Sequence, residues 1–266
     1  MKTIYIRVLE VVVFVIVAFF SSTCSIDRDD RANNLKNMNF VSDVDAICFS
    51  VDGKAFASYQ YHLSYDNNGR LTHEIMNEHF PYGTTKSTSF IFEHNDKNTI
   101  ISSTGDRTDY DGCVLTLDKV GLLLFNGESE ITCSYNSEGQ LIKEEYNNNP
   151  NSYIVYKWEG NNVTSIESYE NGKWFDKQTF TYTPHSNNYS VSVYQIPYEE
   201  PYILNWLIRI GEYANLPEKI VYTYDAGNKI KTEETHYLYE FDAENRVSKC
   251  INMVNNRTSE IIEFKY

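Results

Sequence analysis

The stretch Tyr59-Gln60-Tyr61-His62-Leu63-Ser64-Tyr65 alternates aromatic or aliphatic side chains with polar ones along its whole length. Successive side chains of a β-strand point to opposite faces, so the pattern predicts a strand whose tyrosines and Leu63 face a core. A polar segment from Asp66 to Arg70 follows, and Leu71 then opens another apolar run. The stretch therefore predicts an antiparallel β-hairpin.

The same succession of an aromatic residue, a polar turn and an aliphatic residue recurs along the chain. The further copies are Ile131–Leu141, Ile154–Val163, Ile220–Ile230 and Tyr237–Val247, with a degenerate copy around Phe180 and a half-copy at Ile262–Tyr266. Gly69, Gly139, Asn162, Asn228 and Asn245 occupy the turns, where a positive φ is needed and glycine or asparagine tolerates it best. Each hairpin leaves an edge that the next one must cover. The repeats therefore predict a continuous sheet.

The predicted fold class is all-β: an antiparallel meander of repeated hairpins that curls into a partial barrel and spans residues 45–266 as one domain. One segment departs from the β pattern. The apolar residues between 199 and 213 fit a helical period, with Pro201 near its start and Gly211 near its end. We expect one short helix near 200–212, with a continuous buried strand as the alternative.

The composition supports a folded protein that does not bind nucleic acid. The chain has 266 residues, of which 41% are hydrophobic, which is enough for a core. Its 23 basic residues against 37 acidic ones give a formal net charge of −14 at pH 7. Such a field repels phosphate backbones.

The first residues have the features of a secretory signal. Lys2 and Arg7 precede the apolar run Val11 to Phe20, which is too short to span a bilayer as a helix. Small residues then lead to Cys24. This junction resembles the lipobox of bacterial lipoproteins, although Ser21 and Thr23 depart from its commonest residues. The resemblance implies a signal peptide over 1–23, lipid attachment at Cys24 and a tether over 24–44; plain cleavage or an uncleaved anchor is the alternative.

The segment after Cys24 bears on location. Ser25 to Asp30 resembles the acidic signal that directs Bacteroidetes lipoproteins to the cell surface, and it also fits a solvated linker. We expect an outer-membrane lipoprotein that faces the periplasm or the cell surface. The outward strand positions favour contact with water, because they are polar: Gln60, His62, Ser64, Ser134, Lys157, Thr181, Thr223 and Glu240.

The hairpins themselves carry a family resemblance. The string from Tyr65 to Leu71, with its relatives at Tyr135, Tyr224 and Phe241, resembles the YD (RHS) repeat, a β-hairpin unit of secreted bacterial proteins. With the lipobox-like start and the segment Asn215–Ile220, the chain resembles an uncharacterised Bacteroidetes lipoprotein family described as having a porin-like fold. The resemblance covers roughly residues 45 to 266 and brings no catalytic residues with it.

No recognised motif points to a cofactor or a metal. Cys48, Cys113, Cys133 and Cys250 allow three disulfide pairings, and none has CxxC spacing. The acidic loop around Asp109 and Asp111 has partial calcium-loop spacing but carries Arg107 at the first ligand position. The six histidines form neither an HExxH motif nor a cysteine pair. We therefore expect neither a cofactor nor a metal site.

These observations favour a non-enzymatic surface module that binds a glycan, a protein or another envelope component in the concavity of its sheet. Most tyrosines occupy inward strand positions. The tyrosines of irregular segments are the ligand-binding candidates: Tyr82, Tyr110, Tyr198, Tyr202 and Tyr213. We expect no catalytic residues. The alternative is an enzyme that acts on a surface glycan or other polymer through a pair of carboxylates, which leaves no sequence motif.

Overall fold

The computed structural model describes residues 38–95, 98–107, 111–117, 123–126, 131–136, 140–146, 148–190, 214–227 and 229–266. They form strands and connecting turns only. The strands are β1 (Asp43–Phe49), β2 (Ala55–Tyr65), β3 (Leu71–His79), β4 (Thr85–His94), β5 (Asn98–Gly105), β6 (Val114–Leu117), β7 (Leu123–Asn126), β8 (Ile131–Tyr135), β9 (Leu141–Tyr146), β10 (Asn149–Glu159), β11 (Asn162–Glu170), β12 (Lys173–Ser186), β13 (Asn215–Asp225), β14 (Ile230–Phe241), β15 (Val247–Val254) and β16 (Arg257–Lys265).

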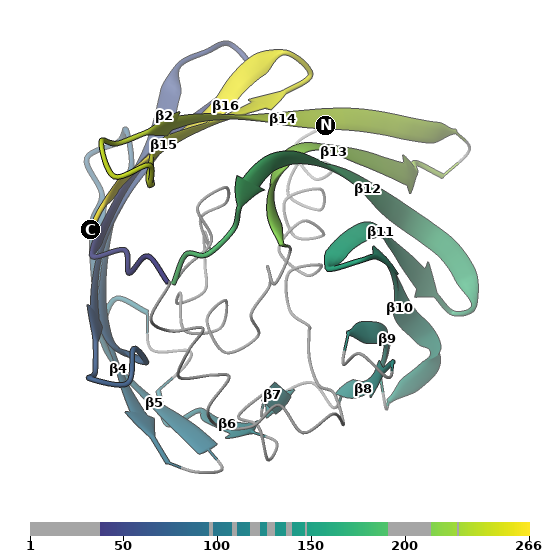
Figure 1. Cartoon of the computed structure of the whole chain (residues 1–266), viewed down its shortest axis with the longest axis horizontal. Helices are drawn as coiled ribbons and strands as arrows, with labels where there is room; N and C mark the ends of the chain where they lie inside the picture. Colours follow the sequence, from purple (N-terminus) through teal and green to yellow (C-terminus); the bar gives the residue numbers. More distant parts are fainter. Residues whose placement is uncertain are drawn as a thin grey trace.

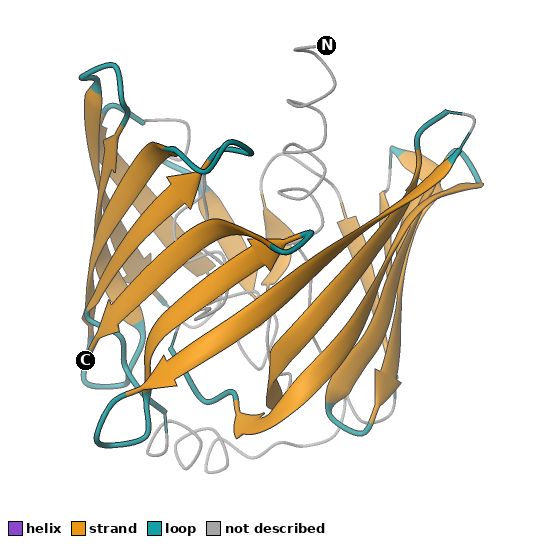
Figure 2. Ribbon diagram, turned by 90° about the horizontal axis from the view of Figure 1, so that it is seen from above, coloured by secondary structure: helices purple, strands orange, loops and turns teal. Residues whose placement is uncertain are grey.

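All sixteen strands belong to one antiparallel sheet that curls into an open ring (Figures 1 and 2). Consecutive strands are neighbours throughout, except that β7 and β8 form the two edges. The sheet is continuous between its first and last strands in the sequence, because β1 pairs with β16. The predicted all-β meander and partial barrel are confirmed.

The inner face carries the core, as the alternation predicts. In β2, Tyr59, Tyr61 and Leu63 are buried, whereas Gln60 and His62 are exposed. The same alternation buries one face of β1, β3, β4, β5 and β16. The outer face exposes polar residues together with some apolar ones such as Ile47, Ile91 and Leu238. The buried apolar residues of neighbouring strands pack together on the concave side.

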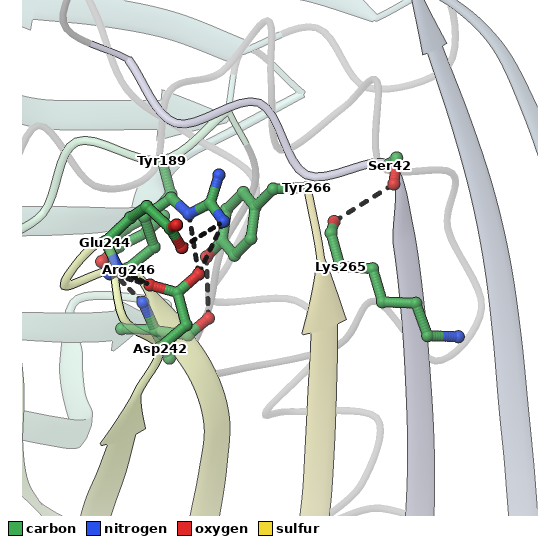
Figure 3. Close-up of polar contacts among 8 residues, drawn as sticks. Ser42, Tyr189, Asp242, Glu244, Arg246, Lys265 and Tyr266 are labelled. Atoms are coloured by element: carbon green, nitrogen blue, oxygen red, sulfur yellow. Dashed lines mark hydrogen bonds and ion pairs between the residues drawn. The ribbon is translucent and has the colours of Figure 1, made fainter.

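Two of the repeated turns are built in the same way. The Asp66 carboxylate accepts hydrogen bonds from the Asn68 and Arg70 backbone N–H groups, and Arg70 Nε donates to its other oxygen. The Asp242 carboxylate accepts the equivalent three hydrogen bonds, from the Glu244 and Arg246 backbone N–H groups and from Arg246 Nε (Figure 3). The aspartate thus satisfies the donors that the turn leaves free.

Other turns use related chemistry. At β8–β9 an amide pair replaces the ion pair, since Gln140 N–H donates to Asn136 Oδ1 and Asn136 Nδ2 donates to Gln140 Oε1. Gly69 and Asn245 have the expected positive φ. The expectation for Asn162 is wrong: Gly160 carries the positive φ of that turn, and Asn162 already begins β11. Gly139 and Asn228 lie outside the described residues.

A second recurring feature joins six of the even-numbered strands to the start of the strand before each of them. We call these bonds aromatic–carbonyl clamps. In each clamp, the polar group of a Tyr, Trp or His side chain near the end of an even-numbered strand contacts a backbone carbonyl oxygen. That carbonyl group lies at or near the start of the preceding odd-numbered strand. They are Tyr65 to Val41, His94 to Leu71, Trp158 to Leu141, Tyr182 to Val163, Tyr239 to Pro217 and Tyr266 to Val247, at 2.6–2.9 Å.

Each clamp joins the residue that ends one hairpin to the strand start at which the same hairpin begins. All six lie at the same end of the sheet, which we call the clamp end, because odd strands start there and even strands finish there. The aliphatic residues at these starts are completely buried: Val41, Leu71, Leu141, Val163, Leu216 and Val247. A ring edge covers the aliphatic side chain while its polar tip satisfies the carbonyl group.

Two chain segments meet inside the ring at the clamp end. Residues 38–41 and 187–190 run inward from the sheet and join through a parallel bridge between Asn39 and Tyr189 (Figure 1). Val41 N–H donates to Ser190 Oγ, and the Tyr189 hydroxyl accepts from Val247 N–H. These contacts place Val41 in the core, so the fold begins a few residues before the expected boundary at 45.

Several expectations concern other parts of the chain. The signal peptide over 1–23, the lipid attachment site Cys24 and the helix near 200–212 lie outside the described residues. No helix among the described residues is long and apolar enough to cross a membrane.

Candidate functional site

One hairpin copy is inverted relative to the others, and the candidate site follows from this inversion. The copy Ile220–Ile230 joins an odd strand, β13, to an even one, β14, so its turn lies at the end of the sheet opposite the clamps. Ile230 is accordingly 60% exposed, whereas Leu71 and Val247 are fully buried. The hydroxyl groups of Tyr222 and Tyr224 in this copy bind carboxylates of the neighbouring strands instead.

The partners of these tyrosines belong to a row of inward-facing positions across the sheet. Glu144 of β9 lies opposite Ile154 of β10, Ile154 opposite Ser168 of β11, Ser168 opposite Asp176 of β12, and Asp176 opposite Tyr224 of β13. Asp176 shares its face with Phe180, four residues further along β12, which is part of the core. The row is therefore on the concave side of the sheet.

Asp176 is the centre of this arrangement. Its side chain is only 1% exposed, and Oδ2 accepts a 3.2 Å hydrogen bond from the Tyr222 hydroxyl. Asp176 Oδ1 and the neighbouring Ser168 Oγ are buried and have no hydrogen-bond partner among the described residues. A buried polar atom of this kind costs about 1–3 kcal/mol unless something satisfies it. Both oxygens are therefore the atoms of this arrangement that a bound polar group would satisfy.

Burial raises the pKa of Asp176, and the nearby Ser168 and Tyr222 hydroxyl groups offset only part of that rise. The negative charge of Glu170 adds to it. The pKa of Tyr222 is also raised, first by burial and then by Asp176, so its hydroxyl group stays a donor. Asp176 thus titrates closer to neutral pH than an ordinary aspartate.

Tyr222 and Tyr224 supply aromatic surface beside Asp176. Their rings are stacked with centroids 5.1 Å apart, and both side chains are half-buried. The Tyr224 hydroxyl donates to Glu233 Oε1 of β14 at 3.2 Å, which fixes the outer ring of the stack. We call Ser168, Asp176, Tyr222, Tyr224 and Glu233 the Asp176 cluster. It combines ring faces with carboxyl and hydroxyl groups, as sites for small polar ligands do.

A second buried acid stands at the other end of the row. Glu144 is 1% exposed and accepts a 2.6 Å hydrogen bond from the Tyr156 hydroxyl. Burial raises the pKa of Glu144 to about 8. Three strand spacings separate the Glu144 and Asp176 backbones, which is roughly 14 Å.

Structure comparison shows what this fold resembles. A crystal structure described as a porin-like protein from Bacteroides uniformis is similar with a TM-score of 0.59 and 18% identity, over 85% of this chain and 96% of that one. A porin-like protein from Bacteroides vulgatus covers 85% of this chain and 98% of its own with a TM-score of 0.34 and 10% identity. The first likeness shows a shared porin-like fold. Sequence comparison matches the chain to no family model and to no curated protein.

One of the five predicted ligand-binding tyrosines lies among the described residues. Tyr82 is 96% exposed in the β3–β4 turn. Tyr110, Tyr198, Tyr202 and Tyr213 lie outside the described residues. Sequence reasoning missed the Asp176 cluster, because Tyr222 and Tyr224 were counted as core residues of an ordinary repeat. The sequence does hold one signal. Asp176 lies two residues before Gln178 and four before Phe180, so it shares the inward face of its strand with them.

The cysteines and histidines form no joint site in the described part of the chain. Cys48 of β1 and Cys250 of β15 are separated by β16, and the Cys133 side chain is outside the described residues. His73 contacts Ser89. No group of three metal-ligating side chains occurs among the described residues. In the loop with calcium-like spacing, Asp111 accepts from Ser103 N–H, and Arg107 forms a bidentate pair with Glu78.

Proposed function

We propose that this protein is a non-enzymatic cell-envelope lipoprotein, tethered through Cys24, that binds a ligand on the concave face of its sheet at the Asp176 cluster. The observation that supports this proposal is the pair of buried, unsatisfied oxygens, Asp176 Oδ1 and Ser168 Oγ, beside the stacked rings of Tyr222 and Tyr224. A ligand that satisfies both oxygens and covers a ring would remove an energetic cost already present in the free protein.

The spacing of Glu144 and Asp176 argues against these two acids acting as a catalytic pair. Hydrolysis of a glycosidic bond uses two carboxyl groups about 5–10 Å apart. Glu144 and Asp176 start from backbones roughly 14 Å apart, and Ile154 and Ser168 stand between them. The enzymatic alternative would therefore pair Asp176 with Glu170 or Glu233, which lie nearer to it than Glu144 does.

The test is a glycan array and a thermal-shift panel of envelope components with the purified protein, followed by a search for product from every hit. The variants Asp176→Asn and Tyr224→Ala should lose the binding that the wild type shows. Thr223→Ala is the matched control, because Thr223 lies between the two tyrosines with its side chain on the other face. Product formation from a hit would favour the enzyme, and binding unaffected by both site variants would reject this location.

The tether has its own test. Labelling of the producing bacterium with radioactive palmitate should mark the wild-type protein. A Cys24→Ser variant that still takes up label would reject attachment at this cysteine.

A further inference from the structure

Four aliphatic side chains form a continuous row on the outer face of the sheet. Leu238 of β14 lies opposite Ile251 of β15, Ile251 lies opposite Ile261 of β16, and Ile261 lies opposite Ile47 of β1. The residues on either side of each along its strand face the core, so all four side chains point outward. We call these four residues the outer stripe.

The outer stripe is accessible from solvent. Leu238 is 53% exposed and Ile47 is 42% exposed, and the two isoleucines between them are partly exposed. The row crosses four strands, which is about 14 Å from β14 to β1. Single exposed apolar side chains are normal on a protein surface, whereas a contiguous group of them marks an interaction site. The stripe lies on the opposite face of the sheet from the Asp176 cluster, so it is a separate surface.

A row of charged side chains runs beside the outer stripe, on its side toward the clamp end. Here Glu240 lies opposite Lys249, Lys249 opposite Glu263, and Glu263 opposite Asp45. Lys249 forms an ion pair with Glu240 at 3.5 Å, and Lys265 forms one with Asp45 at 3.2 Å. Glu263 lies between these two pairs and forms no ion pair with the residues that the structure describes.

We propose that the outer stripe is the interface of a symmetric dimer, in which a second copy of this chain packs on β14, β15, β16 and β1. The two-fold axis runs parallel to the strands and passes between β15 and β16, so that β15 faces β16 of the second copy and β14 faces its β1. This rotation reverses the order of the stripe. Ile251 then meets Ile261 of the second copy, and Leu238 meets Ile47, so an aliphatic side chain opposes an aliphatic one at every position.

The charged row supports the same arrangement. The two-fold rotation brings Lys249 over Glu263 of the second copy, and Glu263 over Lys249 of the second copy. The acid that forms no ion pair within its own chain thus gains a lysine from the other chain, twice in each dimer. Glu240 and Asp45 face one another across the interface, and each already has a lysine of its own chain beside it. A different partner would require neither this reversal symmetry nor a lysine and a glutamate placed across its centre.

Two features limit the strength of the dimer. The outer face of the ring is convex (Figure 1), so the contact is confined to these four strands. The formal net charge of −14 makes two copies repel each other. We therefore expect a reversible dimer with a Kd on the order of 10–100 µM.

The first test is sedimentation velocity of the purified full-length protein over a concentration range up to about 300 µM, which should show a monomer–dimer equilibrium. Ile47→Lys places a charge in the stripe and should weaken the dimer at least about tenfold. Ile91→Lys is the matched control, because Ile91 is an outward isoleucine with 49% exposure on β4, away from the stripe. It makes the same change in net charge and should leave the dimer unchanged.

The second test exchanges charges between chains. Lys249→Glu alone opposes two glutamates across the axis, and Glu263→Lys alone opposes two lysines, so each variant should sediment as a monomer. In an equal mixture, one chain supplies both acids and the other both lysines, so dimers should form again at about the wild-type affinity. An effect within one chain does not produce such recovery. Far-ultraviolet circular dichroism confirms that each variant is folded.

Three results would overturn the dimer: a monomeric wild type over the whole range, equal effects of Ile47→Lys and Ile91→Lys, or a mixture of the charge variants that stays monomeric. Flotation with phosphatidylcholine vesicles examines the other occupant of an apolar surface. A monomeric wild type that binds vesicles, and loses that binding in Ile47→Lys, would assign the stripe to a lipid surface instead. The Asp176 cluster is unaffected by any of these outcomes, because none of the variants touches the concave face.

Discussion

The Tyr266 hydroxyl donates a 2.8 Å hydrogen bond to the carbonyl oxygen of Val247, the residue that begins the neighbouring strand. The last residue described in the chain thus secures the start of β15. Arg246 covers the outer face of the same ring, and the Asp242 carboxylate holds Arg246 in place (Figure 3). A clamp and a turn therefore stabilise each other at this corner of the sheet.

The clamps should contribute measurable stability. Tyr182→Phe and Tyr266→Phe keep the ring and remove the donor, so each should lower the free energy of unfolding by about 1 kcal/mol. The two clamps bond to different strand starts, Val163 and Val247, so the effects should add. Urea denaturation measures both. Tyr82→Phe, in a fully solvated turn, is the control; a loss of equal size there would show that the clamps are not responsible.

The turn chemistry should be exchangeable between hairpins. Asp66→Ala removes the acceptor for the Asn68 and Arg70 N–H groups and should cost on the order of 1 kcal/mol. The double variant Asp66→Asn with Arg70→Gln copies the Asn136–Gln140 turn and should recover most of that loss in urea denaturation. Equal instability of the double and single variants would contradict the equivalence of the two turns.

The same turn predicts a response to acid. Burial alone would raise the pKa of Asp66, but the hydrogen bonds from Arg70 and Asn68 outweigh it, so the pKa is lowered from 3.8. A depressed carboxyl pKa stabilises the fold above the unfolded value, and the contribution disappears as the pH falls through the folded value. The stability advantage of the wild type over Asp66→Ala should therefore shrink below pH 4.

Gly105 should tolerate no side chain. Its φ is +114°, and a Cβ there would collide with the Ser87 carbonyl oxygen across the β4–β5 ladder. Gly105→Ala should therefore destabilise the protein by more than about 2 kcal/mol. Gly172→Ala is the matched control, because its φ is also positive but a Cβ meets nothing within 4 Å. Thermal unfolding of the two variants separates the collision from the cost of positive φ.

The local sequence pattern was sufficient to predict the strands, but it was not sufficient to predict which strands pair to close the ring. The alternation in β2 predicts its buried face, because a strand with one solvated face must alternate. The pairing of β1 with β16, in contrast, joins Val44 to Phe264 at opposite ends of the chain. Nothing in the sequence of either strand specifies its partner, since any amphipathic edge strand would fit. No sequence feature indicates the gap between β7 and β8 either.

The candidate site eluded prediction for a related reason. Tyr222 and Tyr224 have the same local sequence as the clamp tyrosines, and only the parity of the strand decides which end of the sheet their turn occupies. Counting strands through the whole chain would have been necessary. Asp176, by contrast, was visible as an acid on the face of Phe180, although its unsatisfied oxygen is a property of the packed sheet.

Glu144 should make the protein less stable as the pH rises. Its pKa is about 8 in the fold, because burial disfavours the charged form, against 4.5 for an ordinary glutamate. Between these values the folded state binds more protons than the unfolded state, so the free energy of unfolding falls with increasing pH. Glu144→Gln retains an acceptor for the Tyr156 hydroxyl and removes the titration. The variant should gain on the wild type steadily between pH 5 and pH 8, by roughly 3 kcal/mol at pH 7. Urea denaturation across this range measures the difference, and parallel pH profiles for the two proteins would show that Glu144 does not carry the effect.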